Sequence, residues 1–357
     1  MAKADLNSDQ PSSPEQITHW VSLIAIPHQG FTIGLNLLSY RRRKIINEFF
    51  PDPAKHADIY KDLHQHPELP YQEKRTASVV IERLETVGFE AQRGIAKLNK
   101  SMRSGTLIVL FQPNEERLLG AKAMIDDGLF QKNPLPSVCL AQHCVPTKGG
   151  TIAVKPGRVL GYLDSVKLRL YGRGAHGVTP QLAKSCRRPA LSHGSRGLSA
   201  LDVRTSSENT QKLAKAAVER IIRKECEVAG SPTTPRMVTV VSSPAIDNDA
   251  VATSQFTRVF EWYYGRRASE VVQEMPPDIV ADDLVLLALP PGGKPIPYVY
   301  WNIGVTDPET WERVSREGEL RDLPPTHSAM YAPAIEPTLG TGIEAIALSV
   351  LTFLQLL

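Results

Sequence analysis

The sequence predicts an α/β fold, in which helices cover a mostly parallel sheet and a small α+β unit is inserted. Short apolar runs alternate with segments of helical periodicity, an order that favours parallel pairing. From Leu163 to Leu170 apolar and polar residues alternate instead, which is typical of an antiparallel sheet with one wet face. We therefore expect an extension over 1–56, a main domain in two parts over 57–160 and 244–357, and an inserted domain over 161–243.

Composition limits the class of protein. The 357 residues are 42% hydrophobic, which is enough for a sizeable core and two domains. The formal net charge of +3 argues against a surface that coats nucleic acid. No stretch has the length or order of a membrane span or a secretory signal. The four cysteines indicate neither a disulfide framework nor a zinc finger, so we expect a cytoplasmic protein that binds neither nucleic acid nor membranes.

Two adjacent glutamates stand at the centre of the predicted main domain. Thr106–Phe111 is a β-branched and aromatic run that predicts a buried strand, and Gly120–Phe130 predicts a helix. Glu115 and Glu116 fall in the loop between them, at the carboxyl end of the strand, where open α/β sheets place ligands. One carboxylate could bind a cation while the other moves a proton. The alternative is a solvated pair in a surface loop.

Three histidines have settings typical of functional residues. His143 follows the next predicted strand, Val138–Ala141, so we expect it at the same edge of the sheet as the glutamates, where imidazole could bind a metal. His176 lies in a glycine-rich turn that lacks the context of a dinucleotide-binding loop. His327 lies in a proline-flanked loop, just before an apolar terminal helix.

The remaining periodic segments complete the prediction. In the inserted domain, a helix capped by Ser206 or Ser207 accompanies three strands, at Leu163–Leu170, Leu201–Arg204 and Met237–Val241. The main domain resumes with a helix at Phe256–Tyr264, a helix start at Ala281–Leu284, a strand at Tyr298–Ile303 and a helix at Leu339–Leu354.

Several motifs occur together in one order. They are Leu63-His-Gln-His-Pro-Glu-Leu69 with Gln72-Glu73, Leu110-Phe-Gln-Pro-Asn-Glu-Glu116 with Gly120-Ala-Lys-Ala-Met-Ile-Asp-Asp-Gly128, Gln142-His143, Tyr171-Gly-Arg-Gly-Ala-His-Gly177, Val203-Arg204-Thr205 and Thr326-His-Ser328. From about Ala57 onward the chain thereby resembles the metal-dependent amidohydrolases of the aminoacylase, hippurate hydrolase and indoleacetyl-amino-acid hydrolase branch of the co-catalytic metallopeptidases. The resemblance implies a hydrolase that cleaves the amide bond of a small N-acyl amino acid through a metal-activated water. It also implies that the inserted domain is a lid and dimerisation domain.

The resemblance also assigns roles to residues. Glu115 would be the general base, and His176 would polarise the scissile carbonyl. His176 and Arg204 would contact the substrate, and a homodimer is implied. One or two ions of zinc or manganese would be bound by Glu116, His143 and His327.

Parts of the family pattern are missing. The family has a strand ending in Asp-Met-Asp-Ala-Leu-Pro and a Cys-Gly-His-Asp run, which supply further metal ligands, whereas here Gly94-Ile95 passes directly to Ala96. Gln181–Ala200 replaces elements of the inserted domain, and Ala281-Asp-Asp-Leu284 stands where Ser-Glu-Asp-Phe is usual. Three interpretations are therefore open: a hydrolase with a reduced metal site, an inactive member that binds or oligomerises, and the product of a faulty gene model.

Overall fold

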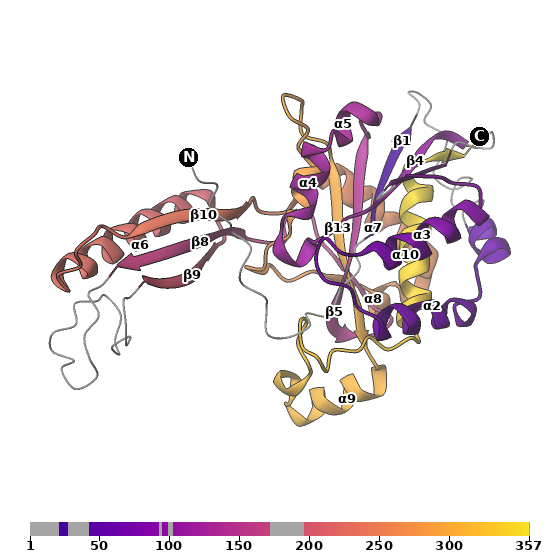
Figure 1. Ribbon diagram of the computed structural model, residues 1–357. Helices are drawn as coiled ribbons and strands as arrows, with labels where there is room; N and C mark the ends of the chain where they lie inside the picture. The colour runs from indigo at the N-terminus through magenta and orange to yellow at the C-terminus, as the bar shows by residue number, and fades with distance from the viewer. Residues whose placement is uncertain (1–20, 28–42, 93–94, 99–102, 172–195, 357) are drawn as a thin grey trace.

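The computed structural model describes residues 21–27, 43–92, 95–98, 103–171 and 196–356 (Figure 1). A nine-stranded sheet with helices on both faces forms the main body, and a separate three-stranded sheet projects from it. The α/β class with an additional α+β unit is therefore confirmed. The strands of the large sheet are β1 (Val21–Pro27), β2 (Glu90–Gln92), β3 (Ile95–Leu98), β4 (Arg103–Phe111), β5 (Val138–Lys148), β6 (Ile152–Val154), β12 (Val272–Glu274), β13 (Tyr298–Thr306) and β14 (Gln355–Leu356).

The large sheet is mixed. Its order is β12-β6-β13-β5-β1-β4-β3-β2, with β14 on β4. β13 pairs in parallel with β5, and β12 pairs in parallel with β6. All other neighbouring strands of this sheet are antiparallel. β4 and β5 run in the same direction, as their strand-helix-strand order predicts, but they are not neighbours. The prediction of a mostly parallel sheet is wrong in this respect, because β1 separates β4 from β5.

β1 comes from the segment that the sequence suggested was only an extension. It pairs antiparallel with β4 on one side and with β5 on the other, so that Ile24 stands opposite both Ile108 and Cys139. Pairing on both sides satisfies the backbone of a strand in the middle of a sheet. Residues 21–27 are therefore part of the main sheet, and residues 43–49 add a helix to the same domain.

Helices form a layer on each face of the large sheet. α7 (Ala250–Tyr264) and α10 (Thr338–Phe353) pack on one face, against the side chains of Val109, Leu140 and Trp301. α4 (Gly120–Asp126), α5 (Leu129–Lys132) and the 3₁₀ turn η4 (Asp283–Ala288) pack on the other, against Leu110 and Tyr300. Neighbouring strand residues thus face opposite cores, as the pleat of a strand requires. The remaining elements of this body are α2 (Ala54–Gln65), α3 (Lys74–Thr86), β7 (Gly157–Arg158), β11 (Asp247–Asn248), η3 (Gly265–Arg267), α8 (Ala268–Val271), α9 (Pro308–Glu317) and η5 (Leu320–Asp322).

The predicted helix over Gly120–Phe130 is divided into α4 and α5. Gly128 separates the two with a φ of +89°, a left-handed conformation that glycine adopts without strain. The terminal helix and the strand at Tyr298 are confirmed, and α7 begins six residues before the predicted Phe256.

The projecting unit contains β8 (Tyr162–Tyr171), β9 (Arg196–Thr205), α6 (Glu208–Val228) and β10 (Arg236–Ser243). β8 is the central strand, antiparallel to both neighbours, and its Leu168 and Leu170 are buried with Cys226 of α6. Ser207 caps α6 by accepting a hydrogen bond from the backbone N–H of Thr210 at 3.1 Å. The predicted alternation and cap are thus confirmed, whereas the domain boundaries at 161 and 243 stay predictions.

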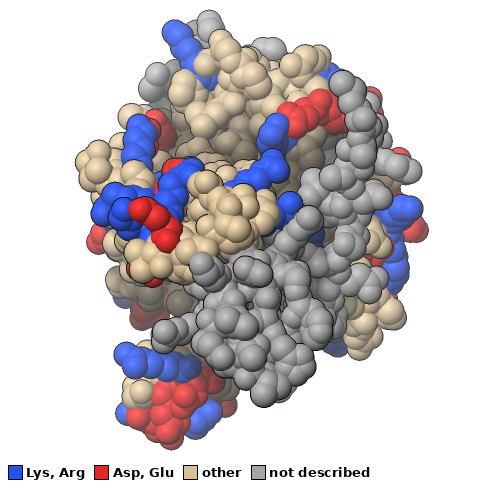
Figure 2. All heavy atoms as spheres, turned by 60° about the vertical axis from the view of Figure 1, so that its left-hand side comes forward, with Lys and Arg blue, Asp and Glu red and all other residues tan. Residues whose placement is uncertain are grey.

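Several further sequence-based expectations can be compared with the structure. Cys226 is disulfide-bonded, so the expectation of no disulfide is wrong at this residue. Within the described ranges, no helix combines the length and apolar character needed to cross a membrane. Figure 2 shows acidic and basic side chains side by side on the face that it displays, as the nearly balanced charge leads us to expect. The cytoplasmic location stays a prediction.

Candidate active site

The loop after β4 makes a sharp turn that presents Glu115 and Glu116. A 3₁₀ turn, η1 (Glu115–Arg117), lies between Asn114 and Leu118, which both have a left-handed backbone. Such a backbone is costly for residues other than glycine, so the surrounding structure must hold it. The carboxylate of Glu73 accepts a hydrogen bond from the N–H of Asn114 at 2.8 Å, and this bond ties the earlier Gln72-Glu73 motif to the glutamate pair.

Close packing fixes the other end of this loop. A Cβ atom added to Gly120 would lie 1.7 Å from the carbonyl oxygen of Pro113, so only glycine fits where α4 begins. The N–H of Ala121 donates to Asp283 Oδ2 at 2.9 Å, and the side-chain amide of Gln112 donates to Asp283 Oδ1. Asp283 therefore joins the end of β4 to the start of α4.

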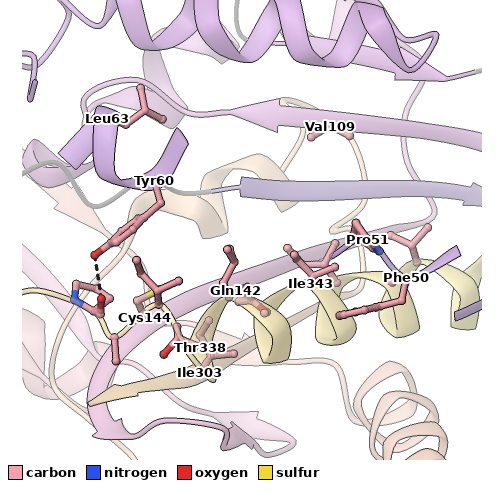
Figure 3. Close-up of a pocket in the computed structure, with 18 of the residues that line it drawn as sticks. Phe50, Pro51, Tyr60, Leu63, Val109, Gln142, Cys144, Ile303, Thr338 and Ile343 are labelled. Atoms are coloured by element: carbon pink, nitrogen blue, oxygen red, sulfur yellow. Dashed lines mark hydrogen bonds between the residues drawn. The ribbon is translucent and has the colours of Figure 1, made fainter. Parts of the chain in front are cut away.

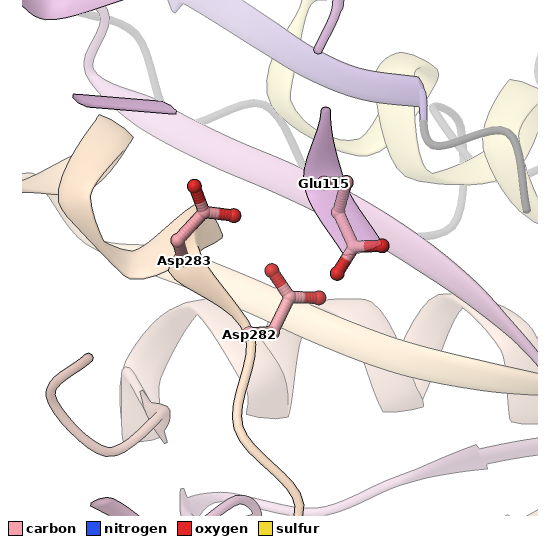
Figure 4. Close-up of side chains that lie close together, drawn as sticks. All are labelled: Glu115, Asp282 and Asp283. Carbon is pink, nitrogen blue, oxygen red and sulfur yellow. The ribbon is translucent and has the colours of Figure 1, made fainter. Parts of the chain in front are cut away.

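Glu115 points toward two buried aspartates (Figure 4). Oxygen atoms of Glu115, Asp282 and Asp283 all lie within 4.8 Å of one another. Asp282 caps η4, with its Oδ1 accepting from the N–H of Leu284 at 2.8 Å. Its Oδ2 is buried and has no hydrogen-bond partner in the described part of the chain. A buried carboxylate oxygen in this state requires a proton or a cation nearby.

The electrostatics of this cluster raise the pKa of both aspartates. Burial raises the pKa of Asp283 to about 6. Burial also raises the pKa of Asp282, and the negative charges of Asp283 and Glu116 add to the shift. Like charges at such distances disfavour full ionisation, because each carboxylate destabilises the charged form of the next. The cluster can therefore accept positive charge or share protons with Glu115.

Glu116 points to a different partner. Its Oε2 lies 2.7 Å from Nδ1 of His327, and the Glu116 side chain is only 10% exposed whereas that of His327 is 62% exposed. His327 has a φ of +69°, and the adjoining backbone turns where the N–H of Ser328 bonds to the carbonyl of Pro325 at 3.1 Å. Two residues of the predicted metal site, 211 positions apart in the sequence by the difference of their numbers, are thus brought together.

His143 lies within a strand rather than just beyond one. β5 continues to Lys148, and His143 stands opposite Asn302 of β13, so the prediction that the strand ends before this histidine is wrong. Parallel pairing with β13 extends the strand past its apolar run. Burial lowers the pKa of His143 to about 3, and the nearby His327 adds to the shift. The imidazole is therefore neutral near pH 7, the form in which histidine binds metals.

We expect this burial to make stability depend on pH. An unfolded chain protonates histidine near pH 6.5, but the folded protein protonates His143 only near pH 3. Between these values the unfolded state binds more protons, so stability falls as the pH is lowered from about 6.5 towards 3, by up to roughly tenfold in the unfolding equilibrium per pH unit. His143→Gln should flatten this dependence in urea titrations of metal-free protein. Equal slopes for the two proteins would contradict the assignment.

The other predicted site residues lie elsewhere. Arg204 is on β9 of the projecting unit, with its guanidinium 3.5 Å from the carboxylate of Asp202. His176 lies outside the described residues. Among described residues, one group of three ligand-type side chains has its ligand atoms within 4.8 Å, and it is the cluster of Glu115, Asp282 and Asp283. The predicted set of Glu116, His143 and His327 does not form such a group, although Glu116 and His327 are in contact.

Sequence reasoning did not assign Asp282 and Asp283 to the site. The sequence does contain a signal for them: they are two adjacent acidic residues directly before an apolar run, at the position of a family motif. What the sequence did not reveal is that both side chains are buried, at 3% and 0% exposure, facing Glu115.

Residues 89–303 of the chain match the model of the peptidase family M20/M25/M40, and this match includes the loop after β4, β5, the projecting unit and the two aspartates. The chain belongs to this family. The family resemblance of the motifs is therefore confirmed.

Curated relatives of this peptidase family match a shorter stretch. The hippurate hydrolase of Campylobacter jejuni is 42% identical over 82 residues, 23% of this chain and 21% of that protein. An N-acetyldiaminopimelate deacetylase of Bacillus licheniformis is 38% identical over 79 residues, 22% of this chain and 21% of that protein. In these matches the chain spans about a fifth of the relatives' length.

Solved structures share the fold over most of the chain. The YXEP protein of Bacillus subtilis, described as a dinuclear metal binding peptidase, aligns with a TM-score of 0.55 at 15% identity, covering 89% of this chain and 98% of that one. An aminobenzoyl-glutamate utilization protein of Klebsiella pneumoniae aligns with a TM-score of 0.59 at 14% identity, covering 88% of this chain and 98% of that one. At these identities the similarity shows the fold.

Proposed function

We propose that the protein is a metal-dependent amidohydrolase that releases an acyl group from a small N-acyl amino acid. The observation that supports this most is the division of the glutamate pair: Glu115 faces the buried aspartates, while Glu116 contacts His327. The relatives include enzymes named for hydrolysis of hippurate and for deacetylation of N-acetyldiaminopimelate, which are N-acyl amino acids. Two adjacent carboxylates with different partners suit the two tasks of proton transfer and cation binding.

The side chains present suit a divalent cation. Glu116 and His327 would hold zinc or manganese, with the neutral His143 as a further ligand, because imidazole and carboxylate are ligands that both metals accept. The buried Oδ2 of Asp282, which lacks a hydrogen-bond partner in the described structure, could stabilise the added positive charge. When bound, the cation supplies electrophilic activation of the amide carbonyl and of water.

The chain's own residues would perform the proton transfers. Glu115 would take the proton of the attacking water and deliver it to the leaving nitrogen of the amide. Asp282 and Asp283, whose pKa values are raised by burial, would share this proton with Glu115. His176 would stabilise the carbonyl oxygen as negative charge develops there, and Arg204 would bind the substrate.

A homodimer remains part of the proposal. The projecting unit would pair with that of a second copy, and Val238 and Val240 on its edge strand β10 are 44% and 51% exposed. Exposed apolar side chains on an edge strand are a surface that pairing between copies would cover.

Metal content and hydrolysis test the proposal together. We expect the purified protein to retain zinc or manganese and to release amine from N-acetylglycine or hippurate. Glu116→Gln and His327→Ala should each weaken metal binding by at least roughly tenfold, because even groups that only support a ligand are worth about 10–100-fold. Affinities can be measured by competition with a chromogenic chelator.

A matched control is Glu319→Gln, which makes the same chemical change on an exposed residue and should leave metal affinity as in the wild type. A folded protein that takes up no metal and hydrolyses no N-acyl amino acid would contradict the proposal. That outcome would favour the inactive binding or oligomerisation protein.

A further inference from the structure

We propose that a large apolar cavity lined in part by His327 receives the acyl group, so that substrates with a long apolar acyl chain are preferred over N-acetyl substrates. This inference rests on the proposed amidohydrolase function and names its substrate class. The cavity has a volume of about 710 Å³ and lies between the large sheet, α2 and α10 (Figure 3). Its size is within the range of about 300–1,000 Å³ that is usual for pockets that bury a small molecule.

The cavity is connected to the candidate site at one end. His327, whose ring nitrogen contacts Glu116, is also one of the residues that line the cavity. Cys144, another lining residue labelled in Figure 3, follows His143 directly on β5. A ligand in the cavity can therefore place its polar end at His327, the partner of Glu116.

Two polar groups of the lining are engaged within the protein, whereas the hydroxyl of Tyr331 is buried without a hydrogen-bond partner in the described structure. The hydroxyl of Tyr60 donates to the carbonyl of Pro333 at 3.1 Å. The side-chain oxygen of Gln142 accepts from the indole N–H of Trp301 at 2.9 Å. Groups that are satisfied in this way keep a cavity wall effectively apolar. His327 is the lining residue that the proposed chemistry uses.

The opposite end is formed by aromatic and aliphatic side chains. Phe50 and Pro51 lie at the right-hand end in Figure 3, and Phe49, Phe89 and Leu351 also line the cavity. Among the described lining residues there is no lysine, arginine, aspartate or glutamate. The amino-acid half of a substrate carries a carboxylate, which would be costly to bury without a partner. The acyl half is therefore the part that fits.

The length of the cavity sets the class of acyl group. Its lining follows α10 from Thr338 to Leu351, which corresponds to about 20 Å along the helix axis at 1.5 Å per residue. An acetyl group would fill only the end beside His327 and would leave most of the apolar cavity wall in contact with water. An extended aliphatic chain would remove much more of that surface from water, and burial of each methylene is favourable.

The test compares two substrates that differ in acyl length, N-dodecanoylglycine and N-acetylglycine. We expect kcat/KM to be higher for the dodecanoyl substrate. Ala347→Trp places a large side chain on the α10 wall and should lower the ratio of the two kcat/KM values by roughly tenfold or more, since even one methylene in an apolar pocket is worth about 10–200-fold. Ala216→Trp, the same change on an exposed position of α6, is the matched control and should leave the ratio unchanged. If Ala347→Trp does not fold, Ala347→Leu should lower the ratio to a smaller extent.

A binding measurement separates this inference from the proposed function. In the Glu115→Gln variant, N-dodecanoylglycine should raise Tm and N-acetylglycine should not, because a ligand stabilises only the folded state that binds it. The added Ala347→Trp change should remove the Tm shift. Hydrolysis of both substrates with a ratio that Ala347→Trp leaves unchanged would overturn the acyl pocket but not the proposed function. A chain-length-dependent Tm shift without hydrolysis of either substrate would support the pocket and contradict the function.

Discussion

Glu115→Gln is expected to lower kcat for hydrolysis of an N-acyl amino acid by roughly 10²–10⁴-fold, the contribution that a positioned proton-transfer group usually makes. Glutamine has nearly the size of glutamate and can keep the left-handed turn at Asn114, but its amide cannot take a proton from water. Because Glu115 lies beside Asp282 and Asp283 rather than against His327, its loss should leave metal affinity largely intact. The measurement is kcat with saturating metal.

Two further variants show whether the loss of activity in Glu115→Gln is specific to the role of Glu115. Glu116→Gln should lose metal and activity together, whereas Glu115→Gln should lose activity alone. Glu319→Gln, on an exposed residue, should retain both. If Glu115→Gln turned over substrate at the wild-type rate, another group would have to be the base, and the assignment of the glutamate pair would be wrong.

Elements with strong local signals could be predicted from the sequence. The alternation along β8 and the serine that caps α6 involve residues only a few positions apart, and both predictions are confirmed. The loop that carries Glu115 was located correctly between a strand and a helix for the same reason. Local patterns therefore suffice to place these residues along the chain.

Features that depend on distant partners could not be predicted in this way. β1 lies in the segment predicted as an extension, and its place in the sheet is set by β4 and β5, about 80 and 115 positions further along the sequence. The end of β5 was misplaced at His143 because pairing with β13 carries the strand onward through polar residues. The burial of Asp282 likewise results from tertiary packing, which overrides the usual exposure of aspartate.

The position of β1 leads to the second large expected effect. Deletion of residues 1–27 should abolish the cooperative melting transition of the main domain. β1 aligns seven residues with β4 and five with β5, so its removal leaves two strands of the sheet interior without their shared partner. A buried backbone group without a hydrogen bond costs about 1–3 kcal/mol. A few such groups would exceed the 5–15 kcal/mol by which native proteins are usually stable.

A deletion of residues 1–20 is the matched control, because it shortens the chain but leaves β1 in place. Calorimetry of the two variants should show a cooperative transition for the shorter deletion alone. Ala25→Pro offers a milder test, since Ala25 is aligned with both Leu107 and Val138 and proline cannot donate to the ladder. If the protein without residues 1–27 melted like the wild type, β1 would not belong to the sheet. Cooperative melting of the undeleted protein would argue against a faulty gene model. A chain that results from incorrect splicing is not expected to contain a strand that pairs on both of its edges.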